Sequence, residues 1–240
     1  MNLTTNISFC FTFVSEKLKI MASQTEENYL KALFSLTNEK ETVNISELGS
    51  ILKVSLPTIN SMVKNLKGQG LVNYEKYKPL SLTEKGKKLA ASIVRKHRLT
   101  EMYLVNKMGF GWEEVHEIAE QIEHISSPIL FDRMDELLNF PKIDPHGSPI
   151  PDKNGEIIWE SHEKLSDCKP GELVKLTALS HDASDFLNFL NNHELHLGLK
   201  IEIKSLEPFD NSMVISYLNH PSETFSKVVC DSLLVERLNQ

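Results

Sequence analysis

The chain has 240 residues, of which 40% are hydrophobic and 25% are charged. This composition is typical of a folded globular protein and excludes the fibrous and disordered classes. No apolar stretch reaches the roughly 18 residues that span a bilayer. The chain's three cysteines form no Cys-x-x-Cys pair, which argues against a disulfide scaffold and a thiolate zinc site. We therefore expect a cytoplasmic protein without a membrane partner.

The charge is distributed unevenly along the chain. Although the net charge is −7, residues 45–98 carry eleven Lys/Arg against three Asp/Glu, which leaves a charge of −15 on the remainder. Binding to a polyanion depends on where positive charge lies rather than on its sum. The basic segment is therefore a candidate nucleic-acid-binding region.

The first 21 residues do not resemble part of a domain. The apolar octet at residues 7–14 has no lysine or arginine before it, so the charged front end of a secretory signal is missing. The string Met21-Ala22-Ser23 resembles a second translation start. We expect residues 1–21 to be an extension outside the fold.

Three helices are predicted in close succession after this extension. Apolar residues recur at helical spacing over residues 25–38. Ser46 can cap a second helix that ends near Leu52, and Ser55 can cap a third that has Pro57 in its first turn. This spacing is typical of a helix-turn-helix.

The third helix and the chain after it have the features of a DNA-contacting unit. The apolar arc of the helix, expected to pack inward, consists of Leu56, Ile59, Met62, Val63 and Leu66. Short strands at 71–74 and 80–82 flank a lysine-bearing tip, which predicts a wing. A helix fits the major groove and wing lysines can neutralise phosphates, although a helical core that does not touch DNA is the alternative. The residues expected toward DNA are Ser55, Thr58, Asn60, Ser61, Lys64, Lys76 and Lys78.

The rest of the chain changes from helical to β-rich. A capped helix is predicted from Thr83 to about Lys107, where Gly109 breaks it. The further predicted elements are helices at 112–125, from 128 onward and at 183–191, a non-helical connection at 144–155, and strands at 173–179, 200–206 and 213–217. The order predicts an α+β fold that is mainly helical and ends in a small β-barrel.

Two of these helices carry imidazole and carboxylate groups at helical spacing. The groups that share an arc of about 100° on the helix at 112–125 are His116, Glu120, Glu123 and His124. His97 and Glu101 form an i, i+4 pair on the preceding helix. Imidazole and carboxylate suit Mn(II), Fe(II), Co(II) or Zn(II), while the absence of thiolate disfavours Cu(I). The alternative is a solvated acidic surface with incidental histidines.

Six strings between residues 25 and 151 carry a resemblance to a known family. They are Glu27-Asn28-Tyr29-Leu30-Lys31, Leu71-Val72-Asn73-Tyr74-Glu75-Lys76-Tyr77, Leu82-Thr83-Glu84-Lys85-Gly86, Arg95-Lys96-His97-Arg98-Leu99-Thr100-Glu101, Val115-His116 through Glu123-His124, and Pro145-His146-Gly147-Ser148-Pro149-Ile150-Pro151. In combination they resemble the diphtheria-toxin-repressor family of metal-dependent transcription regulators, which has iron-responsive and manganese-responsive branches.

The resemblance implies three domains, a homodimer and two metal sites. The implied domains are a winged helix-turn-helix DNA-binding domain at 22–92, a helical metal-binding and dimerisation domain at 93–163, and an SH3-like barrel at 164–240. One implied metal site consists of Asn28, Glu120, Glu123 and His124. The second consists of His97, Glu101 and His116, completed by Asp182 and Asp185 of the barrel.

Three positions depart from the branches of this family. Asn28 is neither the Met of the iron branch nor the Asp of the manganese branch, and Lys31 stands where the manganese branch has a ligating Glu. Glu120 replaces the Cys of the iron branch. A carboxylate in place of a softer ligand favours Mn(II), with Fe(II) as the alternative and Zn(II) or Co(II) as ions that bind in vitro.

These features predict a non-enzymatic repressor of manganese or iron homeostasis genes. It binds palindromic double-stranded operator DNA as a dimer when loaded with Mn(II) or Fe(II), and it has no small organic substrate. Two alternatives stay open: a winged-helix regulator that metal does not control, and a metallohydrolase that uses the same His and carboxylate groups to activate water. Titration of DNA binding with metal distinguishes the first alternative from a metal-dependent repressor. An assay of hydrolytic activity distinguishes the second.

Overall fold

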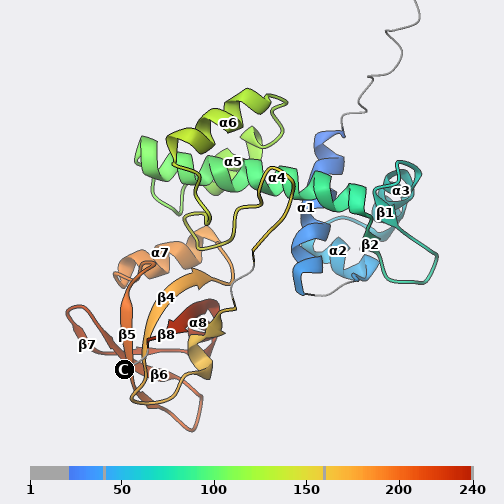
Figure 1. Ribbon diagram of the computed structural model, residues 1–240. Coiled ribbons are helices and arrows are strands. Elements are labelled where there is room, and N and C mark those ends of the chain that lie inside the picture. The colour runs from blue at the N-terminus through green and yellow to red at the C-terminus, as the bar shows by residue number, and fades with distance from the viewer. Residues whose placement is uncertain (1–21, 40–41, 159–160, 239–240) are drawn as a thin grey trace, which may run out of the picture.

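The computed structural model of the chain describes residues 22–39, 42–158 and 161–238. Three parts follow one another along the chain (Figure 1): three helices with a small hairpin, a helical middle, and a β-rich C-terminal part. The expected extension at residues 1–21 lies outside the described residues. None of the described helices is long and apolar enough to cross a membrane.

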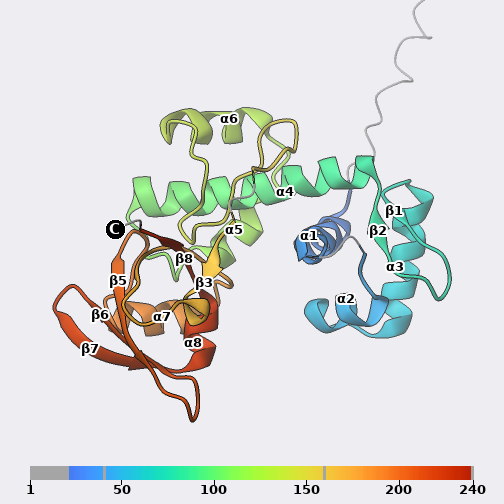
Figure 2. The ribbon, with the colours of Figure 1, turned by 60° about the horizontal axis from the view of Figure 1, so that its bottom comes forward.

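The N-terminal part forms the winged helix-turn-helix that the sequence predicts. Its elements are α1 (Gln24–Glu39), α2 (Ile45–Leu52), α3 (Leu56–Gly68), β1 (Val72–Asn73) and β2 (Ser81–Leu82). The two strands pair antiparallel with Val72 opposite Leu82, and the chain between them forms the wing beside α3 (Figure 2). Fully buried side chains hold these elements together, among them Leu30, Leu33, Leu48, Ile59, Val63, Leu66 and Leu80.

The starts of two helices differ from the expectation. Helix α2 begins directly after Asn44, so Ser46 lies inside the helix rather than at its cap. Ser55 does precede α3, but its hydroxyl lies 2.9 Å from the Thr58 hydroxyl and caps no backbone N–H. Leu56, predicted to pack inward, is 54% exposed, because the buried face of α3 starts one turn later at Ile59.

Helix α4 (Glu84–Tyr103) starts at the end of the wing. The Thr83 side chain accepts a hydrogen bond of 3.0 Å from the backbone N–H of Gly86, which caps the helix. The predicted continuation to about residue 107 is present as a π-helical turn (Leu104–Met108), and Gly109 ends it with a φ of 75°. The sequence therefore predicts the extent of this segment but not its change of helix type.

Helix α4 connects the N-terminal part of the molecule to the helical middle. It contacts α1 at one end and α5 (His116–Ile122) and α6 (Pro128–Leu137) further along, and in Figure 2 it runs between α6 on one side and the β-rich part on the other. The domain boundary expected between residues 92 and 93 falls inside this continuous helix. The DNA-binding and helical parts therefore share one rigid element.

Helix α5 is shorter than the predicted helix at 112–125. Residues 112–115 form a turn instead, in which Glu114 accepts a hydrogen bond from the backbone N–H of Gly111. The Trp112 indole donates to Asn191 Oδ1 at 2.8 Å, so this side chain is held by the C-terminal part rather than by a helix turn. Tertiary contact thus overrides the local helical periodicity at this end.

The C-terminal part is one antiparallel sheet with strand order β3-β8-β4-β5-β6-β7. Its elements are β3 (Glu163–Lys164), a 3-10 turn (Leu165–Asp167), β4 (Leu173–Leu179), α7 (Ser184–Asn192), β5 (Lys200–Leu206), β6 (Met213–Tyr217), β7 (His220–Phe225), α8 (Lys227–Ser232) and β8 (Leu233–Arg237). Register shifts interrupt the β4–β8, β5–β6 and β6–β7 pairings, and such irregularities bend strands. This bent sheet confirms the predicted barrel-type ending, including all three predicted strands.

Strands β3, β7 and β8 are absent from the sequence prediction. In β7 only Phe225 is buried, and the strand contains Pro221 at the edge of the sheet, so it lacks an alternating apolar pattern. Strand β8 follows α8 without a turn residue between them. The local pattern of apolar residues therefore marks neither β7 nor β8 as a separate strand.

The contact between α4 and the wing gives a test of the fold. A Cβ on Gly86 would lie 2.0 Å from the Leu71 carbonyl oxygen, whereas a Cβ on Gly68 meets nothing within 4 Å. We expect Gly86→Ala to lower the free energy of unfolding by about 1–3 kcal/mol, because α4 must move away from the wing. Gly68→Ala is the matched control and is expected to raise it by up to about 1 kcal/mol. Urea unfolding followed by circular dichroism measures both, and equal effects would contradict the close packing.

Candidate metal centre

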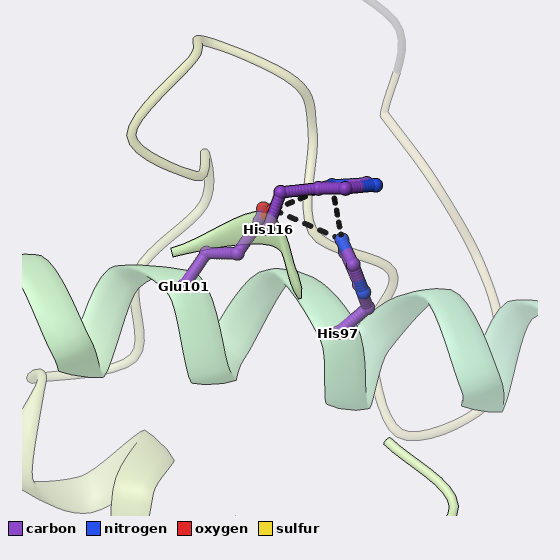
Figure 3. A group of neighbouring side chains, drawn as sticks. All are labelled: His97, Glu101 and His116. Atoms are coloured by element: carbon purple, nitrogen blue, oxygen red, sulfur yellow. Dashed lines mark hydrogen bonds and ion pairs between the residues drawn. The ribbon is translucent and has the colours of Figure 1, made fainter. Parts of the chain in front are cut away.

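The centre of the molecule holds three predicted ligands on two helices (Figure 3). His97 and Glu101 lie one turn apart on α4, with 2.9 Å between His97 Nε2 and Glu101 Oε1. His116, the first residue of α5, lies with its Nδ1 3.3 Å from both of these atoms. One donor atom from each residue falls within 4.8 Å of the others. The arrangement therefore brings two imidazoles and a carboxylate to one point.

His97 and Glu101 are buried, His116 is partly exposed, and the three side chains shift one another's pKa. Burial opposes ionisation of Glu101, but hydrogen bonds from His116 and His97 hold its pKa well below the usual range. Burial also works against protonation of His97, yet its bonds to Glu101 and Glu123 raise its pKa to about 9. The hydrogen bond to Glu101 raises the pKa of His116. A divalent ion would thus replace protons on the imidazoles, since ligating histidines are neutral.

His146 adds a donor that the sequence analysis did not select. It is 2% exposed, and its Nε2 donates to the Trp112 carbonyl oxygen at 2.9 Å, a tautomer assigned from this bond. Its Nδ1 has no hydrogen-bond partner and lies 3.8 Å from Glu101 Oε2. A buried imidazole nitrogen with a free lone pair fits a metal ligand, and His146 groups with Glu101 and Asp182 in a second three-donor set.

The backbone around His146 is held between two parts of the molecule. Asp144 Oδ1 accepts the backbone N–H groups of His146 and Ser148 at 2.8 and 2.9 Å. Gly147 has a φ of 89°, and a Cβ there would lie 2.4 Å from the Thr177 carbonyl oxygen of β4. The sequence analysis used the string around His146 as a predicted connection and as part of a resemblance, without a ligand role for His146, and the structure places this string against β4 of the barrel.

The two barrel residues predicted as ligands have different positions. Asp182 Oδ2 lies 3.9 Å from His116 Nδ1. Asp185, in the first turn of α7, accepts the backbone N–H of Phe186 at 2.8 Å. Only Asp182 of the pair lines the central cavity. The structure therefore brings Asp182 to the cluster and leaves Asp185 at the helix start.

In the second predicted set, the carboxylates of Glu120 and Glu123 contact the ammonium group of Lys31. Glu123 is fully buried, with its Oε2 2.5 Å from His97 Nδ1 and its Oε1 2.8 Å from Lys31 Nζ. Burial opposes ionisation of Glu123, but the His97 bond and the Lys31 charge lower its pKa. His124 Nδ1 faces Glu27 Oε2 at 2.6 Å. Because the Lys31 ammonium contacts Glu120 as well, this set does not fit a metal ion as it stands.

Members of both sets line one cavity of ≈ 450 Å³. The predicted ligands that line it are Asn28, His97, Glu101, His116, Glu120 and Asp182, together with Lys31. Asn28 is exposed on α1. Glu27 and Lys31 are the residues of α1 that make the direct contacts with the second set, and the sequence analysis assigned a role to neither.

The predicted DNA-facing residues lie on the exposed side of α3 and on the wing. Ser55, Thr58, Ser61 and Lys64 are exposed. Asn60 uses both ends of its amide internally, donating to the Leu56 carbonyl and accepting from the Tyr74 hydroxyl. Lys76 lies over the ring of Tyr77, which is 90% exposed at the wing tip. Lys78 forms an ion pair with Glu75.

Comparison with known proteins matches the first two parts of the chain to described domains. Residues 21–80 match the family model "Iron dependent repressor, N-terminal DNA binding domain". Residues 83–152 match "Iron dependent repressor, metal binding and dimerisation domain". The two models meet at the wing, directly before α4.

Curated relatives include two repressors. The diphtheria toxin repressor of Corynebacterium efficiens is 32% identical over 189 residues, which cover 75% of this chain and 82% of that protein. The iron-dependent repressor IdeR of Mycobacterium tuberculosis is 39% identical over 127 residues, 53% of this chain and 55% of that protein. The chain thus spans just over half of the length of the mycobacterial relatives that it matches.

Solved structures extend the likeness to the C-terminal part. A manganese-dependent transcriptional repressor in complex with manganese superimposes with a TM-score of 0.79 at 28% identity, over 89% of this chain and 100% of that one. ScaR with bound Zn²⁺ has a TM-score of 0.74 at 32% identity, over 89% and 99% of the two chains. The chain belongs to the diphtheria-toxin-repressor family of iron- and manganese-dependent transcriptional repressors.

Proposed function

We propose that this chain is a metal-dependent repressor that binds double-stranded operator DNA as a homodimer in the cytoplasm. The observation that carries the proposal is the cluster formed by His97 and Glu101, near the end of the helix that starts at the wing, and His116 of α5. Two imidazoles and a carboxylate converge there, and the His146 Nδ1, which makes no hydrogen bond, lies 3.8 Å from the same carboxylate. The names of the matched relatives support metal control of this centre.

Mn(II) is the metal that the donor set favours. The residues with donor atoms near the cluster offer nitrogen and oxygen only, which suits Mn(II) and Fe(II) better than thiophilic ions. Glu120 supplies a carboxylate rather than a thiolate on the cavity wall. When bound, the ion supplies positive charge that draws the donors of α4, α5 and the barrel together. Fe(II) is the second choice, and Zn(II) and Co(II) are expected to bind in vitro.

Helix α1 joins the metal centre to the DNA-reading helix. On one side Glu27 and Lys31 contact His124 and Glu123 of the α5 region. On the other side Glu26, which is 8% exposed, accepts hydrogen bonds from the side chains of Asn65 on α3 and Gln69 just after it, at 2.6 and 2.5 Å. A change at the centre therefore has a direct path to the orientation of α3. Coupling of this kind is reciprocal, so operator DNA should tighten metal binding.

The homodimer rests on the surface around α6. Large apolar side chains are exposed there, namely Ile129, Leu137, Phe140 and Ile143, at 73%, 48%, 55% and 44%. Such a patch marks an interaction surface, and this segment lies within the match to the metal-binding and dimerisation model. A two-fold dimer presents two α3 helices to the two halves of a palindromic operator.

The decisive experiment is a fluorescence-anisotropy titration of DNA from upstream of the protein's own gene. The protein is first stripped with a chelator, and Mn(II), Fe(II) and Zn(II) are then added separately. We expect DNA affinity to rise with metal, most strongly with Mn(II), and the Mn(II) affinity to rise when DNA is present. Equal DNA affinity with and without metal would reject metal control in favour of a metal-independent winged-helix regulator.

Replacing Glu101 tests the metal centre itself. Saturating Mn(II) is expected to raise the melting temperature of the stripped protein, because a ligand at about 100 times its Kd stabilises by about 2.7 kcal/mol. Glu101→Gln keeps the size of the side chain but removes the shared carboxylate, so most of this rise should disappear. Asp185→Asn is the matched control, since its carboxylate accepts the backbone N–H of Phe186 in the first turn of α7 and does not line the cavity, and it should retain the full rise.

The wing lysines are expected to bind phosphate groups of the DNA backbone. Removing one such lysine should reduce the slope of log affinity against log salt by about 0.9. We expect Lys76→Ala to weaken metal-loaded binding to specific and random DNA alike, with a shallower salt slope. Lys200→Ala, which removes an exposed lysine of the barrel strand β5, should leave the slope unchanged; an equal reduction in both variants would argue against phosphate binding by the wing.

A further inference from the structure

The Lys31 ammonium lies among oxygen atoms of the second predicted ligand set. Its Nζ is 2.8 Å from Glu123 Oε1, 2.9 Å from Glu123 Oε2 and 3.4 Å from Glu120 Oε1. The Lys31 side chain is 18% exposed and that of Glu123 is fully buried. Lys31 comes from α1 and both carboxylates from the α5 region, 89 to 92 positions further along the chain, so tertiary structure creates this contact.

A buried carboxylate requires positive charge close by. Glu123 obtains it from two sides, from His97 on α4 and from Lys31 on α1. A divalent ion held by Glu120 and Glu123 would need the oxygen atoms that Lys31 now contacts. The ammonium and the ion therefore compete for the same two carboxylates, because two cations cannot share them at bonding distance without strong repulsion.

The other donor set is free of this competition. Among the contacts described for His97, Glu101, His116 and His146, none involves a lysine ammonium at bonding distance. His146 Nδ1 makes no hydrogen bond. The two sets of donors therefore differ. Beside the first set lies the His146 nitrogen, which makes no hydrogen bond, whereas the carboxylates of the second set contact the Lys31 ammonium.

We propose that Lys31 is a built-in competitor of the metal, which holds Glu120 and Glu123 in the metal-free chain and must withdraw before an ion binds there. The proposal rests on the metal-dependent function proposed above. It makes filling of the two sites unequal, with the set around Glu101 loaded first. If the ammonium occupies its site in about nine of ten metal-free molecules, the apparent Kd of that site is about tenfold weaker than the intrinsic one.

Isothermal titration of stripped protein with Mn(II) tests this competition. The test variant is Lys31→Met, which keeps the length of the side chain and removes its charge. We expect two classes of site in the wild type, and in the variant a gain of about tenfold or more in the affinity of the weaker class. The metal-free variant should also melt at a lower temperature, because Glu123 loses a partner.

Two control variants separate charge from side-chain loss. Lys31→Arg keeps the cation and should leave the weaker site no tighter than in the wild type. Lys153→Met removes a lysine from an exposed ion pair with Asp132, and both Mn(II) affinities should be unchanged. A purely structural role of Lys31 predicts the lower melting temperature alone, without tighter metal binding, and that result would overturn the proposal.

A second measurement needs no variant and uses the wild-type protein. Brief acetylation followed by mass spectrometry reports how reactive each lysine amine is. Saturating Mn(II) should raise the acetylation of Lys31 several-fold while leaving Lys153 unchanged, because the ammonium leaves Glu123 for solvent. Unchanged or lower Lys31 reactivity would overturn the proposal.

The outcomes also distinguish this proposal from the function on which it rests. Titrations that show no Mn(II) binding in either wild type or Lys31→Met reject the metal-dependent function and this proposal together. Two Mn(II) sites with affinities that Lys31→Met does not raise reject only the role of Lys31, and leave metal control of DNA binding intact.

Discussion

The carboxylate of Glu123 constrains how three helices meet. It is fully buried on the α5 side, and its charge is balanced by His97 of α4 and Lys31 of α1. Breaking a buried pair by removing one partner costs much more than an exposed pair does. The helices therefore cannot shift independently, and a change in the cations around Glu123 must be shared by all three. Helix α1 also contacts α3 through the Glu26–Asn65 hydrogen bond. The charge of Glu123 is therefore connected to α3 through α1.

Helix α4 connects the winged helix-turn-helix to the helical middle of the molecule. Its first turn is capped by Thr83 at the wing, Arg95 forms an ion pair with Asp135 of α6, and the turns that follow carry His97 and Glu101. A helix of twenty residues is about 30 Å long, so one rigid element spans from the wing to the helical part. The cluster thus lies where a small displacement of α1 or α5 relative to α4 changes the placement of the winged helix.

The C-terminal part takes part in the centre rather than being a separate appendage. The Trp112 indole donates a hydrogen bond to Asn191 of α7, and the Trp112 carbonyl oxygen accepts a hydrogen bond from the His146 imidazole. Gly147 lets the connecting segment lie against β4 at a distance that a side chain would prevent. Asp182 then reaches the cavity from the loop before α7. A ligand in the cavity would therefore contact groups from the helical and the β-rich parts together.

Local patterns were enough to predict the helix-turn-helix, the lysine-bearing wing, the long helix after it and the three most regular strands, because each has a periodic or capping pattern within its own segment. Helical spacing paired His97 with Glu101 as candidate ligands, whereas their grouping with His116 of another helix came from the family resemblance. The contact of Lys31 with Glu123 and the position of His146 beside Glu101 became evident from the folded chain alone. Those distances depend on how segments far apart in the chain pack together, and no local periodicity encodes them.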